Sequence, residues 1–423
     1  MPGKDSVARR THDSTNERAE MASYQQWIRS SVVTKDEIDA FLSADEPSWA
    51  QYDAELGYTL GSYMPRDGVD GSLTISTSTA DGTRRAAIYQ DRICRLNTYG
   101  NSFTECHQVS DHETWQEYLA AHLGEPIRNF GMGGYGAYQS YRRMIRTEAS
   151  DSGTEYVLLY IWGDDHYRSA MRCRHAITLN WYRARLEQGA GMFHGNFWAN
   201  IEMDLQSGEL TECDSLAPTP DSLYGMTDGE FMVEMLRDDL MLQMTLYDKG
   251  DTEDVDVERL NQLAEWLNSS PIVEASDDMR EQVGALRTAY AFAATRQIID
   301  KAAAFAERQN KKLMFILFCP RVMRQLISGE RRYDLEIVDY LQRQGHRVFD
   351  MNLVHEEDFK QFDLSLDQYV ERYFIGHYSP AGNHFFAHSI KNAIVEWLDP
   401  KPLTYRDDEA EAAIDFRGYL PES

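Results

Sequence analysis

Ser102 stands in the segment Tyr99-Gly-Asn-Ser-Phe-Thr104, directly after a short apolar run that ends in glycine. A serine at the carboxyl end of a strand in an open α/β sheet points toward the crevice in which ligands of such sheets bind. The segment is not the G-x-S-x-G elbow of α/β-hydrolases, because Thr104 replaces the last glycine. Two interpretations of Ser102 therefore stay open: a nucleophile, or a serine that only caps the helix after the strand.

Three more segments place chemically useful groups at the ends of predicted strands or at the start of a predicted helix. They are Asn129-Phe-Gly-Met-Gly-Gly-Tyr-Gly136, Gly163-Asp-Asp-His166 and Gly376-His-Tyr-Ser-Pro-Ala-Gly382. A glycine-rich loop can approach a ligand closely and offer backbone N–H groups to it. His377, in the third segment, can serve as the general base that a serine hydroxyl needs near neutral pH.

The chain that would position these groups alternates between strand and helix patterns. Short apolar runs predict strands at 93–100, 127–130, 156–162, 312–318 and 347–351, and helical periodicity is found at 113–123, 138–148, 285–309, 333–344 and 379–398. The run YVLLYIW at 156–162 is apolar on both faces, as in a parallel sheet that helices cover on both sides. This alternation predicts a doubly wound α/β sheet.

The remaining segments are predicted to be additions to this core. Residues 1–20 are polar and predicted to be disordered, and 401–423 form a C-terminal tail. Residues 21–92 are expected to form an accessory layer, with a helix at 23–42 and a β-hairpin whose strands are 72–79 and 84–89. The two halves of the core are 93–166 and 285–400, and 167–284 between them is an insertion or cap.

Composition and charge exclude several classes of function. The 423 residues include 42 basic and 69 acidic side chains, for a net charge of −27, so neither nucleic acid nor a membrane surface is an expected partner. Five cysteines without a CxxC pair, and histidines 166, 175 and 194 at no compact spacing, predict neither a metal site nor a cofactor. No secretory signal or run of about 18 apolar residues is found, so the cytoplasm is the expected compartment. The oligomeric state stays open.

The order of the four segments resembles the SGNH/GDSL hydrolase family. GNSFT (100–104) is similar to the block that carries the nucleophile, and the glycine of the second block maps to Gly134; GDDH (163–166) falls at the third block, and GHYSPAG (376–382) is similar to the block with the catalytic histidine. The resemblance covers roughly 93–166 and 286–398. It implies a flavodoxin-like three-layer α/β/α fold with a parallel sheet, and an oxyanion hole built from the N–H groups of Ser102 and Gly134.

Two positions depart from the family pattern. Phe374 stands three residues before His377, where the family has an aspartate. Asp350, at the end of a predicted strand, is expected to orient the imidazole instead; Glu371 or a backbone carbonyl are the alternatives. The asparagine that serves as third oxyanion donor is replaced by Asp165, or by Asp164 if the alignment shifts by one. An ionised aspartate cannot donate, so this residue is either protonated or has another role.

Four residues are candidates for contact with a substrate, namely Asn101, Arg168, Arg172 and Trp198. The three arginines at 168, 172 and 174 can clamp a carboxylate, sulfate or phosphate group, or can form a solvated helix face balanced by nearby acids. Trp198 belongs to an aromatic-rich stretch whose rings can stack on sugars or can form a small core under the insertion.

The activity expected from these residues is cofactor-independent hydrolysis of a small-molecule or carbohydrate ester, in which Ser102 attacks an O-acyl group and His377 acts as base. Two other functions stay open. An acyltransferase would use the same pair of residues beneath a cap that excludes water. A carbohydrate-binding protein on a degenerate hydrolase scaffold would account for the departures at positions 165 and 374.

Overall fold

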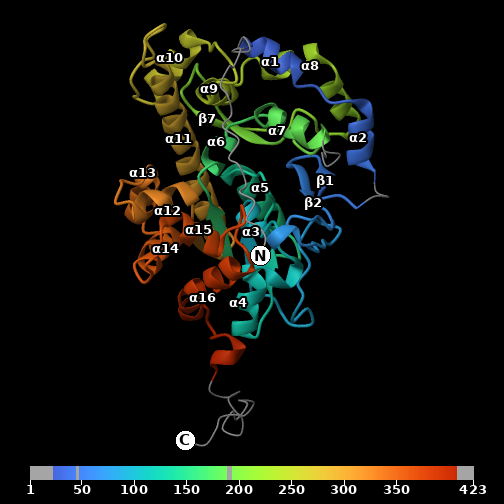
Figure 1. The fold of residues 1–423 in the computed structure, drawn as a ribbon, viewed down its shortest axis with the longest axis vertical. Helices are drawn as coiled ribbons and strands as arrows, with labels where there is room; N and C mark the ends of the chain where they lie inside the picture. Colours follow the sequence, from blue (N-terminus) through green and yellow to red (C-terminus); the bar gives the residue numbers. More distant parts are fainter. Residues whose placement is uncertain (1–21, 44–46, 188–192, 407–423) are drawn as a thin grey trace, which may run out of the picture.

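A five-stranded parallel sheet forms the centre of the molecule (Figure 1). The computed structural model describes residues 22–43, 47–187 and 193–406. The strands follow the order β4-β3-β5-β8-β9, with bounds β3 Leu96–Tyr99, β4 Ile127–Asn129, β5 Tyr156–Ile161, β8 Lys312–Leu317 and β9 Arg347–Asp350. The predicted parallel α/β sheet is thereby confirmed. The N-terminal segment 1–20 and residues 407–423 of the predicted tail lie outside the described residues.

Helices cover both faces of this sheet. Along β5, Val157 and Leu159 belong to the core on one side, where α5, α11 and α13 pack. Leu158 and Tyr160 alternate with them and belong to the core on the other side, because successive side chains of a strand point to opposite faces. The helices of the two layers are α4 Trp115–Leu123, α5 Ala137–Glu148, α11 Met279–Arg308, α12 Pro320–Ile327, α13 Leu335–Arg343, α14 Met351–Phe359, α15 Leu366–Tyr373 and α16 Pro380–Trp397.

The direction of the chain across the sheet changes between β3 and β5. From β3 the chain continues to β4 at one edge, whereas from β5 it continues to β8 and β9 at the other edge. Ligands of open α/β sheets bind outside the carboxyl ends of the strands at such a switch point. The residues that follow Tyr99 and Ile161, the last residues of β3 and β5, are therefore the ones placed to form a site.

The insertion and the N-terminal helices lie together beyond one end of the sheet, at the top of Figure 1. Tyr24 in α1 donates to the Leu236 carbonyl at 2.7 Å, and Trp27 donates to the Ala176 carbonyl at 3.0 Å. Their side chains share one continuous core with α5 and α11. The elements of this region are α1 Tyr24–Ser30, α2 Lys35–Leu42, α6 Asp165–Arg168, α7 His175–Glu187, β6 Asn200–Met203, β7 Leu210–Cys213, α8 Gly229–Leu236, α9 Leu240–Lys249 and α10 Val257–Trp266.

Two predicted elements of the accessory layer differ from the structure. The helix expected at 23–42 is two helices, because Ser23 and Thr34 each start a helix with a capping box of their own. The hairpin predicted at 72–89 is reduced to a turn and one antiparallel bridge, between Ser78 and Arg84, and the antiparallel pair of strands in this layer is β1 Ala50–Asp53 with β2 Gly57–Leu60. Arg84 is drawn into the core instead, where its buried guanidinium donates to three backbone carbonyls and pairs with Asp111.

The 30-residue helix α11 joins the insertion to the sheet. It begins beside α9 and α10 and ends just before β8, and its apolar side chains contribute to the core throughout. Despite its length, no helix within the described ranges is apolar enough over a sufficient span to cross a bilayer.

Trp181 and Trp198, the two tryptophans of the aromatic-rich region, provide a test of whether its rings have a structural role. Trp198 is 0% exposed, whereas Trp181 is 54% exposed. Trp198→Ala should lower the free energy of unfolding by about 3–5 kcal/mol, because it removes a large buried ring. Trp181→Ala is the matched control and should change it by less than about 0.5 kcal/mol. Urea denaturation measures both, and an equally small effect of the two substitutions would contradict a structural role for Trp198.

Candidate active site

The structure brings Ser102 and His377 together although 275 positions separate them in sequence. Ser102 is the first residue of the one-turn helix α3 (Ser102–Glu105), which follows β3. His377 lies in the loop between α15 and α16. Ser102 Oγ and His377 Nε2 are 2.7 Å apart, within hydrogen-bonding distance.

Gln108 fixes the tautomer of His377. Its Oε1 accepts the His377 backbone N–H at 2.9 Å and lies 2.9 Å from His377 Nδ1. Its Nε2 donates to the carbonyls of Asp67 at 3.1 Å and Ile375 at 3.2 Å. These backbone partners allow only one orientation of the amide, since an N–H must meet an oxygen and a carbonyl must meet the NH₂ group. Nδ1 therefore carries the proton, and Nε2 is free to accept the one from Ser102.

The chain curls sharply after α3 to bring Gln108 back to the histidine. Cys106 and Gln108 have φ values of 61° and 72°, in the left-handed region that such residues seldom adopt. Opposite them, Gly376 has a φ of 115°, and a Cβ atom there would lie 2.7 Å from Gln108 Oε1. The glycine before the histidine is thus required for the close approach of the two loops.

Asp350 does not orient the imidazole, which corrects the sequence-based assignment. Both ring nitrogens of His377 already face Ser102 and Gln108. Asp350 instead caps α14 by accepting the Asn352 N–H at 3.0 Å, and its other oxygen pairs with Arg332 at 2.5 Å. The sequence left open a backbone carbonyl as the group that orients the ring. The structure instead places the side-chain carbonyl of Gln108 there.

Burial keeps His377 neutral. It lowers the pKa of the ring to about 3, because an imidazolium ion would lose its hydration there. Electrostatic interactions with His107 and Arg168 lower the pKa of His377 further, while the carboxylate of Glu105 opposes them. A neutral imidazole near physiological pH is the form that can accept a proton from the serine.

The backbone N–H groups of Ser102 and Gly134, beside the nucleophile, donate no hydrogen bond within the described part of the chain. The N–H groups of 103–105 and 130–133, on either side, all have acceptors. The Met132 N–H donates to the Gly100 carbonyl at 3.0 Å, so the glycine-rich loop lies against the loop of Ser102. Unpaired N–H groups in this position can bind an oxyanion.

Glu105 holds the glycine-rich loop in place. Its buried carboxylate accepts the Gly133 N–H at 2.6 Å and the indole N–H of Trp49 at 2.8 Å. Burial raises the pKa of Glu105, but a hydrogen bond to His107 and the charge of that ring outweigh it, so the pKa lies below its ordinary value. An ionised carboxylate therefore anchors the residue immediately before Gly134.

Asp165, at the position of the third oxyanion donor, and Asn101, a candidate for substrate contact, bind each other and brace the nucleophile loop. Both residues are fully buried. The amide nitrogen of Asn101 lies 2.9 and 3.0 Å from the two oxygens of Asp165, one of which also accepts the Trp162 N–H at 2.9 Å. Asn101 in turn caps α3 by accepting the Phe103 N–H at 2.8 Å. Burial raises the pKa of Asp165 to about 7, while Arg168 and Asn101 lower it.

Arg172 and Trp198 are engaged inside the insertion, so their assignment to substrate binding is also corrected. Arg172 donates to both oxygens of Glu202, at 2.6 and 2.8 Å, and to the Met235 carbonyl at 2.8 Å. Trp198 donates to the Met171 carbonyl at 2.5 Å from within the core. Trp198 follows the core alternative that the sequence left open; Arg172 is balanced by an acid, Glu202, but it lies outside the helices.

Arg168 lies at the site. Its Nη2 pairs with Asp164 at 3.0 Å, and its guanidinium carbon lies 5.3 Å from the centre of the Trp162 ring. Its charge is one of those that lower the pKa of His377. Of the three arginines of this segment, Arg168 and Arg174 border the glycine-rich loop, since added Cβ atoms at Gly136 and Gly134 would meet them.

Aromatic rings of the accessory layer lie beside the site, and the sequence patterns did not indicate them. The ring centre of Trp49 lies 5.8 Å from that of His107 and 4.6 Å from that of His194. His107 lies 5.1 Å from His377, and the hydroxyl of Tyr58 donates into the glycine-rich loop. Aromatic residues in a segment of irregular structure carry no local signal of a site, so only their contacts identify them.

A cavity of about 170 Å³ lies beyond the ends of β5 and β8. Trp162, Asp164, Arg321 and Tyr333 are among the residues that line it. The ring of Trp162 stacks on Phe103 with a centroid distance of 5.8 Å. The Trp162 ring therefore lies between the cavity and Phe103, the residue that follows the nucleophile.

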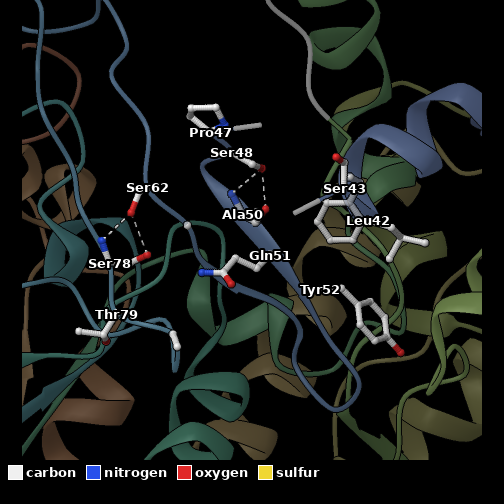
Figure 2. Close-up of a pocket in the computed structure, with 13 residues that line it drawn as sticks. Leu42, Ser43, Pro47, Ser48, Ala50, Gln51, Tyr52, Ser62, Ser78 and Thr79 are labelled. Carbon is white, nitrogen blue, oxygen red and sulfur yellow. Dashed lines mark hydrogen bonds between the residues drawn. The ribbon is translucent and has the colours of Figure 1, made fainter. Parts of the chain in front are cut away.

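A larger hollow, of about 640 Å³, opens in the accessory layer between α2, β1 and the turn at 78–80 (Figure 2). Its polar groups satisfy one another: the hydroxyls of Ser62 and Ser78 are 3.3 Å apart, and Ser48 donates to the Ala50 carbonyl at 2.6 Å. Neither Ser102 nor His377 lines it, and Tyr52 is the only titratable side chain among its described lining residues.

Comparisons with known proteins assign no function to this site. No protein-family model matches the chain, and no curated protein sequence is significantly similar to it. The functional interpretation of the site therefore depends on its geometry.

The lowered pKa of His377 leads to a prediction about pH. Protonation of Nε2 abolishes its function as a base, so kcat/KM for an uncharged ester should stay level down to about pH 4 and fall only toward lower pH. A pH profile of kcat/KM, with circular dichroism at each pH to verify folding, measures this. An inflection near pH 6.5 in folded protein would contradict the lowered pKa.

The contact with Gln108 leads to a second prediction. Gln108→Ala removes the acceptor of Nδ1–H and should lower kcat by roughly 10²–10⁴-fold, the range attributed to general-base catalysis. Gln108→Glu should move the acid limb of the profile to higher pH, since a carboxylate stabilises the imidazolium ion. Gln361→Ala, an exposed site outside this cluster, is the control. An unchanged kcat in Gln108→Ala would exclude an orienting role.

Proposed function

We propose that this protein is a serine-dependent ester hydrolase of the SGNH/GDSL type, acting on O-acyl esters of a carbohydrate or another polar metabolite. The observation that carries the proposal is the 2.7 Å contact between Ser102 Oγ and His377 Nε2, with Nδ1 held by Gln108. The unpaired N–H groups of Ser102 and Gly134 add to it. A nucleophile, a neutral base and oxyanion donors are the groups that acyl transfer requires.

In the proposed reaction, Ser102 Oγ attacks the ester carbonyl while its proton passes to His377 Nε2. The carbonyl oxygen becomes an oxyanion, which accepts hydrogen bonds from the N–H groups of Ser102 and Gly134. When the tetrahedral intermediate collapses, Nε2–H protonates the leaving alcohol and an acyl-serine remains. Water then attacks this ester with His377 again as base, and the carboxylic acid is released. Gln108 accepts the Nδ1 hydrogen bond throughout.

The strand order supports assignment to a flavodoxin-like three-layer fold. Numbered along the chain, the order β4-β3-β5-β8-β9 is 2-1-3-4-5, the order of flavodoxin-like sheets. Ser102 follows the first of these strands, and His377 precedes the last helix, α16. The same positions carry the nucleophile and the histidine in the SGNH/GDSL pattern that the sequence resembles.

The substrate class rests on the cavity beside Trp162. Its lining combines aromatic rings, such as Tyr333, with charged groups, such as Arg321 and Asp164. Polar ring compounds bind to such mixed surfaces through stacking and hydrogen bonds. Among the described residues, no carboxylate bonds to the ring of His377, and this favours a second candidate, a carbohydrate-binding protein on an inactive hydrolase scaffold. An acyltransferase would use the same residues as the hydrolase.

Reaction with a fluorophosphonate probe tests the proposal. The wild-type protein should be labelled at Ser102 and should hydrolyse 4-nitrophenyl acetate. Ser102→Ala should lose both properties with its fold intact, because no other group supplies the nucleophile. Ser110→Ala, in the loop before α4, is the matched control and should keep both. Folded wild-type protein that is neither labelled nor active would favour the binding protein, and ester formation with added alcohols would favour the acyltransferase.

A further inference from the structure

Two arginines lie beside the glycine-rich loop of the proposed oxyanion site. Arg174 packs directly against Gly134, where a Cβ atom would lie 2.3 Å from Arg174 Nη1. The same nitrogen lies 3.4 Å from the Tyr58 hydroxyl and 3.2 Å from His194 Nε2. With a φ of 83° and no room for a side chain, Gly134 is the residue that lets Arg174 approach so closely.

Arg168, the last residue of α6, lies beside the same loop, since a Cβ atom at Gly136 would lie 2.9 Å from its backbone carbonyl carbon. Its side chain is 12% exposed and pairs through Nη2 with Asp164. Its charge acts on both His377 and the Tyr58 hydroxyl, and the charge of Arg174 acts on Tyr58 as well. The buried phenol of Tyr58 therefore lies within the field of both arginines.

Each arginine keeps one terminal nitrogen free. In the described part of the chain, Arg174 Nη2 donates no hydrogen bond, and Arg168 Nη1 approaches only Asp165 Oδ1, at 3.7 Å, beyond hydrogen-bonding distance. Neither of these two atoms is among the buried unpaired ones, whereas the Nε atoms of both residues are. Two donors with formal positive charge thus stay open to solvent beside the glycine-rich loop.

The charge of Arg174 has no counterpart among the described residues. No carboxylate lies within 4.0 Å of it, although the chain has 69 acidic and 42 basic side chains. A half-buried cation loses part of its hydration, and a nearby anion can replace that interaction. The net charge of −27 would also repel an anionic ligand unless cations act on it locally.

We propose that the ester bound at this site carries an anionic group, a carboxylate, sulfate or phosphate, and that Arg168 and Arg174 bind it. The proposal rests on the hydrolase function and names the substrate class within it. Arg168 Nη1 and Arg174 Nη2 donate charge-assisted hydrogen bonds to the anion, which lies over the glycine-rich loop. Arg172 lies between these two arginines in sequence, but it does not bind the anion, because its charge is balanced by Glu202.

Paired esters that differ only in charge test the proposal. One pair, 4-acetoxybenzoate and its methyl ester, carries the anion in the alcohol part; the other, 4-nitrophenyl succinate and its methyl ester, carries it in the acyl part. The wild-type protein should prefer the anionic member of at least one pair by about 10-fold or more in kcat/KM. Added salt should weaken that preference, since it screens the attraction. No preference in either pair would overturn the proposal.

Substitution of Arg174 localises the effect. Arg174→Met should raise KM for the preferred anionic ester by about 10–100-fold and leave the kinetics of its methyl ester within about 2-fold. Arg174→Lys should restore part of the affinity, because it restores the charge without the second nitrogen. Arg347 lies at the amino end of β9, and the site lies beyond the carboxyl ends of the strands, so Arg347→Met is the control. An equal loss of kcat for both esters would mean that Arg174 acts on the oxyanion, and would overturn the proposal.

Binding to an inactive variant separates this proposal from the hydrolase function. Ser102→Ala cannot turn over an ester, so calorimetry measures affinity alone. It should bind the preferred anionic ester more tightly than the methyl ester, and Ser102→Ala/Arg174→Met should lose the difference. Equal affinities would overturn anion recognition even in an active hydrolase. A clear difference together with an inactive wild-type protein would retain anion recognition and reject hydrolysis.

Discussion

The hydrogen bond from Ser102 to His377 requires a neutral imidazole with its proton on the far nitrogen, and the surrounding structure supplies both conditions. Burial keeps the ring neutral by lowering its pKa to about 3. The carbonyl oxygen of Gln108 selects the tautomer, and two backbone carbonyls hold the amide of Gln108 in turn. A carboxylate at position 108 would set its oxygens against those carbonyls, which gives a physical reason for an amide there.

The buried acids of the site position other groups instead of reacting. Glu105 holds the glycine-rich loop through the Gly133 N–H, and Asp165 holds Asn101, which starts α3. Each of these acids fixes the loop that carries one of the two unpaired N–H groups. A catalytic geometry within a few tenths of an ångström depends on such support, because loops are otherwise the most mobile parts of a fold.

The segments outside the sheet complete the site. The accessory layer contributes Trp49 and Tyr58, and the start of the insertion contributes Arg168 and Arg174. The shared core of the insertion and the N-terminal helices ties both segments to α5 and α11. A minimal α/β sheet would present Ser102 and His377 to open solvent; here aromatic rings and guanidinium groups surround them and restrict what can approach.

The sequence alone determined the parallel sheet, most of its helices and the Ser102–His377 pair, because apolar periodicity and strand-end motifs are local signals. It also left open that an acid balances Arg172 and that Trp198 belongs to a core, and the structure shows both. Gln108, Glu105 and Arg174 became recognisable only in the folded chain. Their roles come from contacts across loops, from positive φ values and from the lack of a partner, none of which depends on neighbouring residues in sequence. Only one bridge of the hairpin predicted at 72–89 forms, because tertiary contacts hold Arg84, which belongs to its second strand, in the core.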